Sequence, residues 1–91
     1  MDEIGYRIIF KGRVQGVGFR YTARQIAQKH SVNGWVLNRH DGDVEVYMQG
    51  ESQALGSVIG ELKEIFRHNL NDVEVTENSV KDIETGFHVR F

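Results

Sequence analysis

The 91-residue chain shows two kinds of hydrophobic spacing. In several short stretches apolar residues recur at every second position, which is typical of half-buried strands. In two longer stretches they recur at steps of three and four residues, which is typical of a helix that buries one face. The order of these stretches predicts strand, helix, strand, strand, helix and strand, with a short extra strand at the end.

The first predicted strand and helix are joined by a glycine-rich loop. Tyr6, Ile8 and Phe10 share one face of the strand, and the residues that follow at 15–18, QGVG, are too rich in glycine to continue it. From this point the spacing becomes helical. The apolar stripe of the helix is Phe19, Ala23, Ile26, Ala27 and His30.

A hairpin is predicted after this helix. The residues at 33–34, Asn-Gly, are expected to form a break near the C-terminal end of the helix, and 35–38, WVLN, to form the next strand. The Asp-Gly pair at 41–42 is a strong signal for a two-residue hairpin turn. The strand after the turn is marked by Val44, Val46 and Met48.

The second predicted helix is expected to begin with Ser52 as its cap. Gly56 and Gly60 each destabilise its interior by about 1 kcal/mol relative to alanine. Close packing and tolerated surface positions are both open explanations for these glycines. The apolar stripe is Leu55, Ile59, Leu62 and Phe66, with Val58 and Ile65 beside it.

Two helices with one apolar face each need a sheet that covers those faces. An antiparallel sheet with both helices on one side meets this need and predicts an α+β sandwich of the ferredoxin-like type, βαββαβ. We expect residues 1–91 to form a single domain, because this length suffices for one core and not for two. The fold alone decides no function. The remaining strands are marked by Val73 and Val75, and by Phe87, Val89 and Phe91.

Composition excludes several classes of protein. A net charge of -2 and a pI of about 6.0 argue against nucleic-acid binding. The absence of cysteine excludes disulfides and thiolate chemistry. The N-terminus is not that of a signal peptide, and no apolar stretch suits a membrane span, so we expect a cytoplasmic protein. No metal is expected, because the four histidines lack ligand spacing. They are His30, His40, His68 and His88.

The segment at 12–20, GRVQGVGFR, is the most informative part of the chain. It joins a strand to a helix N-terminus, and glycine at positions 16 and 18 allows successive amides to turn toward one anion. Arg20 lies at the positive end of this helix, which is unfavourable by about 0.3–1 kcal/mol unless an anion lies between them. A solvated arginine above a structural turn is the other open reading. The segment is not a P-loop.

This segment, together with GWVLNRHDGDVE from Gly34, resembles the acylphosphatase family over residues 12–51. The terminal FHVRF resembles the closing strand of that family. The resemblance implies an acylphosphate phosphohydrolase that cleaves the carboxyl-phosphate anhydride with no cofactor, no metal and no covalent intermediate. It implies that Arg20 is catalytic and that Asn38 orients the attacking water. The implied phosphate-binding backbone is that of Gln15, Gly16, Val17, Gly18 and Phe19.

The residue chemistry of Asn38 agrees with this role, because an amide offers both a donor and an acceptor to a water molecule. From its place before a hairpin alone, Asn38 would be a turn residue. Thr22 is expected on the helix surface, although its hydroxyl could reach the loop. Trp35 and Tyr47 are expected to be packing residues, with a rim role possible for Tyr47.

We also hypothesise that the terminal carboxylate of Phe91 pairs with Arg20, since short closing strands often pair centrally. The chain departs from the family at 66–72, which leaves the conformation of that loop open. A phosphate-binding module without activity and an RNA-binding sheet are the rival readings. The presence of both Arg20 and Asn38 favours the enzyme. Expected partners are small acyl phosphates, with inorganic phosphate or another anion in the loop, and neither nucleic acid nor membrane. We expect a monomer.

Overall fold

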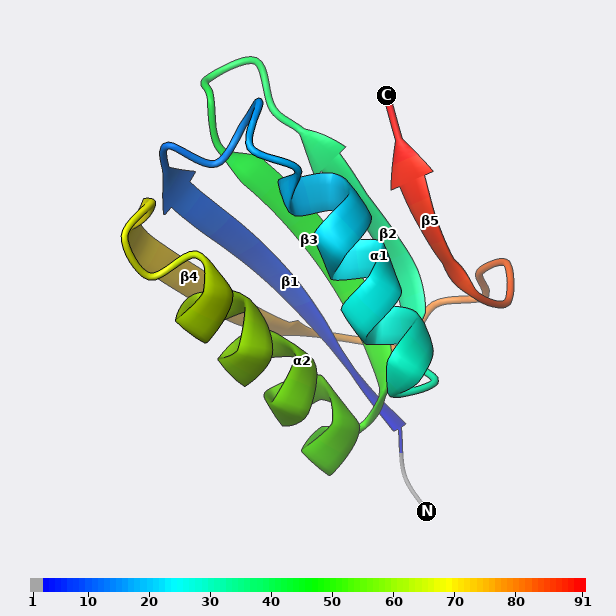
Figure 1. Ribbon diagram of the computed structural model, residues 1–91. Coiled ribbons are helices and arrows are strands. Elements are labelled where there is room, and N and C mark those ends of the chain that lie inside the picture. The colour runs from blue at the N-terminus through cyan, green and yellow to red at the C-terminus, as the bar shows by residue number, and fades with distance from the viewer. Residues whose placement is uncertain (1–2) are drawn as a thin grey trace.

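The computed structural model describes residues 3–91, which form a five-stranded sheet with two helices on one face (Figure 1). The order across the sheet is β4-β1-β3-β2-β5. This arrangement confirms the predicted ferredoxin-like α+β fold. The strands are β1 (Glu3–Gly12), β2 (Asn33–Asn38), β3 (Val44–Glu51), β4 (Leu70–Asn78) and β5 (Phe87–Arg90), and the helices are α1 (Phe19–Lys29) and α2 (Ser52–Ile65).

The last strand departs from the expected antiparallel pairing. Strands β1 to β4 are joined in antiparallel pairs, whereas β5 runs parallel to β2 at the sheet edge. The connection from β4 crosses the sheet face opposite the helices, where the Gln49 side chain of β3 donates to the Lys81 carbonyl and accepts a hydrogen bond from the Lys81 amide. The connection leaves the end of β4 and reaches the edge of β2 at that same end of the sheet. Strand β5 therefore runs opposite to β4 and parallel to β2.

The core lies between the helices and the covered face of the sheet. Phe19 fixes the start of α1 to this core, with its ring centroid 4.9 Å from that of Phe10 and 4.6 Å from that of Phe66. The predicted period-two and helical stripes therefore meet as expected. The fully or almost fully buried residues include Ile8, Val36, Val44, Val46, Met48, Ala23, Ile26, Ala27, Leu55, Val58 and Leu62.

Some local expectations are wrong. Ser52 is the first residue of α2 rather than its cap, and the N-cap residue Glu51 makes no side-chain capping bond. Ile65 is 55% exposed and lies outside the core. After α1 the left-handed residue is Ser31, with φ of 57°, and the Asn-Gly pair at 33–34, expected as a break near the helix end, forms the first two residues of β2.

The topology brings two distant motifs to one end of the sheet. Strands β1 and β2 run in the same direction on either side of β3, so they end on the same side of the molecule. The loop 13–18 leaves β1 at that end and leads to the N-terminus of α1, while β2 ends there at Asn38. Figure 1 shows this loop and the β2–β3 turn close to the start of α1.

Candidate active site

The loop between β1 and α1 passes twice through the left-handed backbone region. Gly16 has φ of 76° and Gly18 has φ of 79°, a conformation that costs other L-residues about 1–2 kcal/mol. A Cβ atom at either position would meet nothing within 4 Å. Backbone conformation, and not lack of space, therefore requires glycine here. Both residues and Val17 between them are exposed, so the loop backbone is open to a ligand.

The start of helix α1 has no capping group. Gly18 is its N-cap residue, no side chain bonds to the first amides, and the first turn holds no acidic residue. The first amides of a helix have no intrahelical partner, and they carry partial positive charge. Arg20 adds a full positive charge in the same turn. This end of α1 is therefore strongly electropositive.

A hollow of about 210 Å³ opens at this helix end. Among the predicted site residues, Gly16, Gly18, Phe19, Arg20 and Asn38 line it, whereas Gln15 and Val17 do not. Two separate stretches of the sequence thus contribute to one small cavity.

Arg20 is held in place by the C-terminal end of the chain. Its Nη1 donates a hydrogen bond to the carbonyl oxygen of Arg90 over 3.1 Å, and its guanidinium carbon lies 4.6 Å from the centre of the Phe91 ring. The hypothesis of an ion pair with the terminal carboxylate is wrong, since no ion pair among residues 3–91 joins the two groups. The closing strand also lies at an edge of the sheet and not at its centre.

Asn38 is the last residue of β2. Side chains alternate along a strand, so Asn38 shares the helix-covered face with the buried Val36. A turn of five residues, from Arg39 to Asp43, follows it, in which the Arg39 amide donates to the Asp43 carbonyl over 2.8 Å. The predicted hairpin is therefore confirmed, but its two-residue turn is wrong.

The turn is stiffened by the carboxylate of Asp41. It accepts a hydrogen bond from the backbone amide of Asp43 over 3.0 Å and another from the Arg39 guanidinium over 3.1 Å. The amide of Asp43 first, and then the Arg39 side chain, lower the pKa of Asp41 below its usual value. The segment directly after Asn38 is therefore well fixed.

The chain matches the acylphosphatase family over residues 6–89, which include the glycine loop, Arg20 and Asn38. The chain belongs to the acylphosphatase family. The acylphosphatase of Bacillus licheniformis is 39% identical over 87 residues, which cover 94% of this chain and 97% of that protein. The predicted enzyme class, a hydrolase of acyl phosphates, is confirmed by this family.

Solved acylphosphatase structures have the same fold. The crystal structure of the Bacillus subtilis acylphosphatase superposes with a TM-score of 0.86 at 38% identity, covering 97% of this chain and 99% of that one. The acylphosphatase from Coxiella burnetii gives a TM-score of 0.85 at 31% identity, covering 98% and 94% of the two chains. The likeness therefore extends over the whole described fold.

Two residues that line this hollow, Val14 and Tyr21, were not predicted from the sequence, and for Gln15 only a backbone role was predicted. Val14 lines the hollow and is 1% exposed; it continues the period-two pattern of β1, which could have revealed it. Tyr21 lines the hollow from the first turn of α1, and no sequence signal marked it. The side-chain amide of Gln15 donates to the carbonyls of Arg39 and Asp43 over 2.7 and 3.0 Å.

Tyr47 lies on the opposite face of the sheet. Its ring is stacked on that of Trp35 with centroids 4.7 Å apart, and its hydroxyl donates to Gln49 Oε1 over 2.6 Å. Burial raises the pKa of Tyr47. The packing role predicted for both aromatic residues is confirmed, whereas a rim role for Tyr47 is wrong. Thr22 is half-buried in α1 and does not line the hollow.

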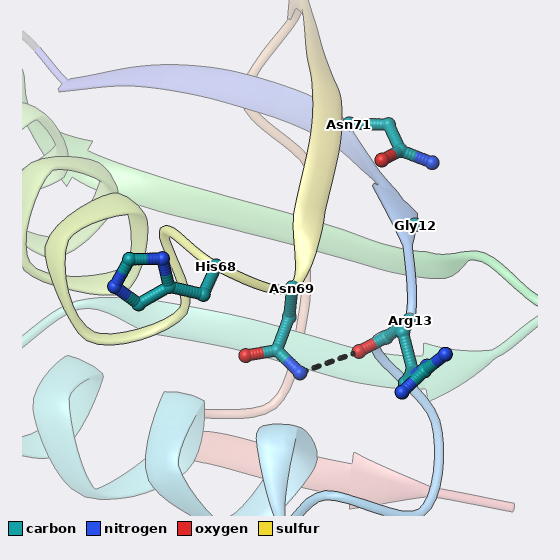
Figure 2. Close-up of a pocket in the computed structure, with 5 residues that line it drawn as sticks. All are labelled: Gly12, Arg13, His68, Asn69 and Asn71. Carbon is teal, nitrogen blue, oxygen red and sulfur yellow. Dashed lines mark hydrogen bonds between the residues drawn. The ribbon is translucent and has the colours of Figure 1, made fainter.

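A larger hollow, of about 530 Å³, lies beside the turn that precedes β4, lined by Gly12, Arg13, His68, Asn69 and Asn71 (Figure 2). The Arg13 amide donates to the Asn69 carbonyl over 2.8 Å, and Asn69 Nδ2 donates to the Arg13 carbonyl over 3.0 Å. These bonds fix the turn to the start of the glycine loop. Figure 2 shows Arg13 and His68 on opposite sides of Asn69, so they do not converge on one ligand.

Neither a metal cluster nor a membrane helix is found in the described part of the chain. Within residues 3–91, histidine, aspartate and glutamate side chains nowhere form a group of three suited to a metal ion. Neither helix that the structure describes is long and apolar enough to cross a bilayer.

Proposed function

We propose that the chain hydrolyses acyl phosphates by in-line attack of water on the phosphoryl group, without a metal ion or a covalent intermediate. The water oxygen forms a bond to phosphorus while the bond from phosphorus to the acyl oxygen breaks. The products are a carboxylate and inorganic phosphate, which carries both hydrogens of the attacking water until one of them ionises to solvent. The single observation that carries this proposal is that Arg20 and Asn38, from two distant motifs, line one hollow at an uncapped helix end.

The phosphoryl group is bound by the backbone of residues 15–19 and by Arg20. An exposed loop with two left-handed glycines and a free helix N-terminus offers amides and a partial positive charge to an anion. The Arg20 guanidinium uses one donor on the Arg90 carbonyl, and a guanidinium has five. A phosphoryl group between Arg20 and the helix end turns an unfavourable charge arrangement into a favourable one.

Asn38 orients the attacking water. Its amide is too weak a base to deprotonate water, but phosphoryl transfer is loose and the carboxylate leaving group of an acyl phosphate is good. Catalysis then requires correct positioning and stabilisation of charge more than a strong base. The place of Asn38 at the wall of the hollow supports this role.

The proposal is tested by following hydrolysis of benzoyl phosphate in EDTA with wild type, Arg20→Lys and Asn38→Ala. We expect metal-independent turnover in the wild type and a loss of kcat of about 10²–10³ in each variant. Asn71→Ala is a matched control, because Asn71 is exposed and lies in the other hollow.

Binding of inorganic phosphate separates the two roles. Asn38→Ala is expected to keep phosphate affinity while losing turnover, whereas Arg20→Lys is expected to weaken both. A folded wild type without turnover that still binds phosphate would contradict the proposal and leave a phosphate-binding module.

A further inference from the structure

We propose that the side-chain amide of Gln15 is a positioning group that holds Asn38 in register with the phosphate-binding loop. This inference rests on the proposed function and adds to it a role for the side chain of Gln15, which bonds to the β2–β3 turn and not to the substrate or the water. Gln15 does not line the hollow. Its role is exerted through the β2–β3 turn.

The contact joins the loop that binds the phosphoryl group to the turn that follows Asn38, the residue that orients the water. Gln15 Nε2 donates to the carbonyl oxygen of Arg39 over 2.7 Å and to that of Asp43 over 3.0 Å. A primary amide nitrogen carries two hydrogens, so both donors are used. Arg39 directly follows Asn38, and Asp43 directly precedes Val44, the strand partner of Asn38. One amide thus bridges both ends of the turn that begins after the water-binding residue.

The glycine loop needs such a connection because its middle is otherwise exposed. Val14 and Phe19 anchor its two ends in the core, while residues 16–18 are exposed. Gln15 is half-buried, and its side chain reaches out of this loop to a different strand connection. In-line attack demands that water and phosphorus be aligned, and an error of about 1 Å can reduce a rate about 100-fold. The Gln15 amide sets this spacing.

The charged groups of the turn do not replace this connection. Arg39 pairs with Asp41 over 3.1 Å and with Glu45 over 3.2 Å, and Glu45 also pairs with Arg7 over 3.2 Å. These contacts stiffen the hairpin and tie it to β1, but none of them reaches residues 13–18. The link between loop and turn is therefore specific to the Gln15 amide.

Gln15→Met tests the inference, since methionine keeps the approximate length of the side chain and removes the amide donors. We expect kcat for benzoyl phosphate to fall about tenfold, while affinity for inorganic phosphate changes less than about twofold, because the backbone amides and Arg20 remain. Gln28→Met, an exposed glutamine of α1, is the matched control and should leave both quantities unchanged.

A second arm distinguishes positioning from a general structural role. In an Asn38→Ala background there is no oriented water to misplace, so adding Gln15→Met should change turnover less than about twofold. An equal tenfold loss in both backgrounds, or a parallel loss of phosphate affinity, would overturn the role of Gln15. A folded wild type without turnover would instead overturn the proposed function itself, so the two failures are distinguishable.

Discussion

Helices α1 and α2 pack side by side on the same face of the sheet, yet their N-termini differ (Figure 1). Helix α2 follows directly from β3, and its N-cap residue Glu51 brings a negative charge to the positive helix end. Helix α1 starts after an exposed glycine loop and carries Arg20 in its first turn. The positive charge of Arg20 at the positive end of α1 is unfavourable without a ligand and suits the binding of an anion. Helix α2 carries no cation in its first turn and serves packing.

The glycines of the two helices give the largest contrast. Gly18 and Gly60 both have free space where a Cβ atom would be, but only Gly18 has positive φ. We expect Gly18→Ala to destabilise the fold by about 1–2 kcal/mol and Gly60→Ala to stabilise it by about 1 kcal/mol. Urea unfolding of both variants measures the difference.

The same pair separates function from stability. Gly18→Ala should weaken phosphate binding, and Gly60→Ala should leave it unchanged. The open space beside Gly56 and Gly60 identifies both as surface positions and excludes close packing as their explanation. Equal destabilisation by the two alanine variants would contradict the conformational argument.

Adding a carboxylate to each first turn is a smaller and sharper test. Tyr21→Glu in α1 and Gln53→Glu in α2 each place a negative charge near a helix N-terminus, which should add about 0.3–1 kcal/mol of stability. Both side chains are exposed. Tyr21 lines the hollow, so its replacement should also lower phosphate affinity, while Gln53→Glu should not.

Thermal unfolding with and without phosphate checks this pair. A ligand that binds only the folded state raises the unfolding temperature. Wild type and Gln53→Glu should show this rise, and Tyr21→Glu should show less of it. An equal rise in all three proteins would mean that phosphate binds away from the start of α1.

The features that could be predicted from the sequence are those that appear in it as a local pattern. The stripes of α1 and β3 are visible as periodicity, and the glycine loop with Arg20 and Asn38 is visible as two motifs. Contacts between distant segments leave no such pattern. The Gln15 amide meets a turn 24 residues away, and Arg20 meets the carbonyl of Arg90, 70 residues away. The parallel pairing of β5 likewise depends on the path of its connection, which periodicity does not encode.

Ser52 illustrates a different kind of failure. Serine is favoured at the N-cap, and here it occupies the first helical position because β3 leads into α2 without a loop. A local preference was thus overruled by the strand that precedes the helix. Before α1, by contrast, a loop separates the strand from the helix, and Gly18 occupies the N-cap position.

The C-terminal end of α1 provides the last and smallest test. Lys29 Nζ lies 2.6 Å from Glu61 Oε1 of α2, and His30, which follows α1 rather than extending its apolar stripe, also bonds to Glu61. The Lys29 hydrogen bond first, and then that of His30, lower the pKa of Glu61 below its ordinary 4.5. The folded state therefore favours the ionised carboxylate. Its stabilising effect is present above pH 4.5 and is lost as the pH falls through the lower folded value.

Glu61→Gln removes this titration. We expect the free energy of unfolding to fall less between about pH 7 and about pH 3 in the variant than in the wild type. Phosphate affinity at neutral pH should not change, because the contact lies at the end of α1 opposite the glycine loop. An identical pH dependence in both proteins would show that the favourable charges at this end contribute nothing measurable. The electrostatic difference between the two ends of α1, an unfavourable cation at the start and favourable charge pairs at the finish, would then rest on Arg20 alone.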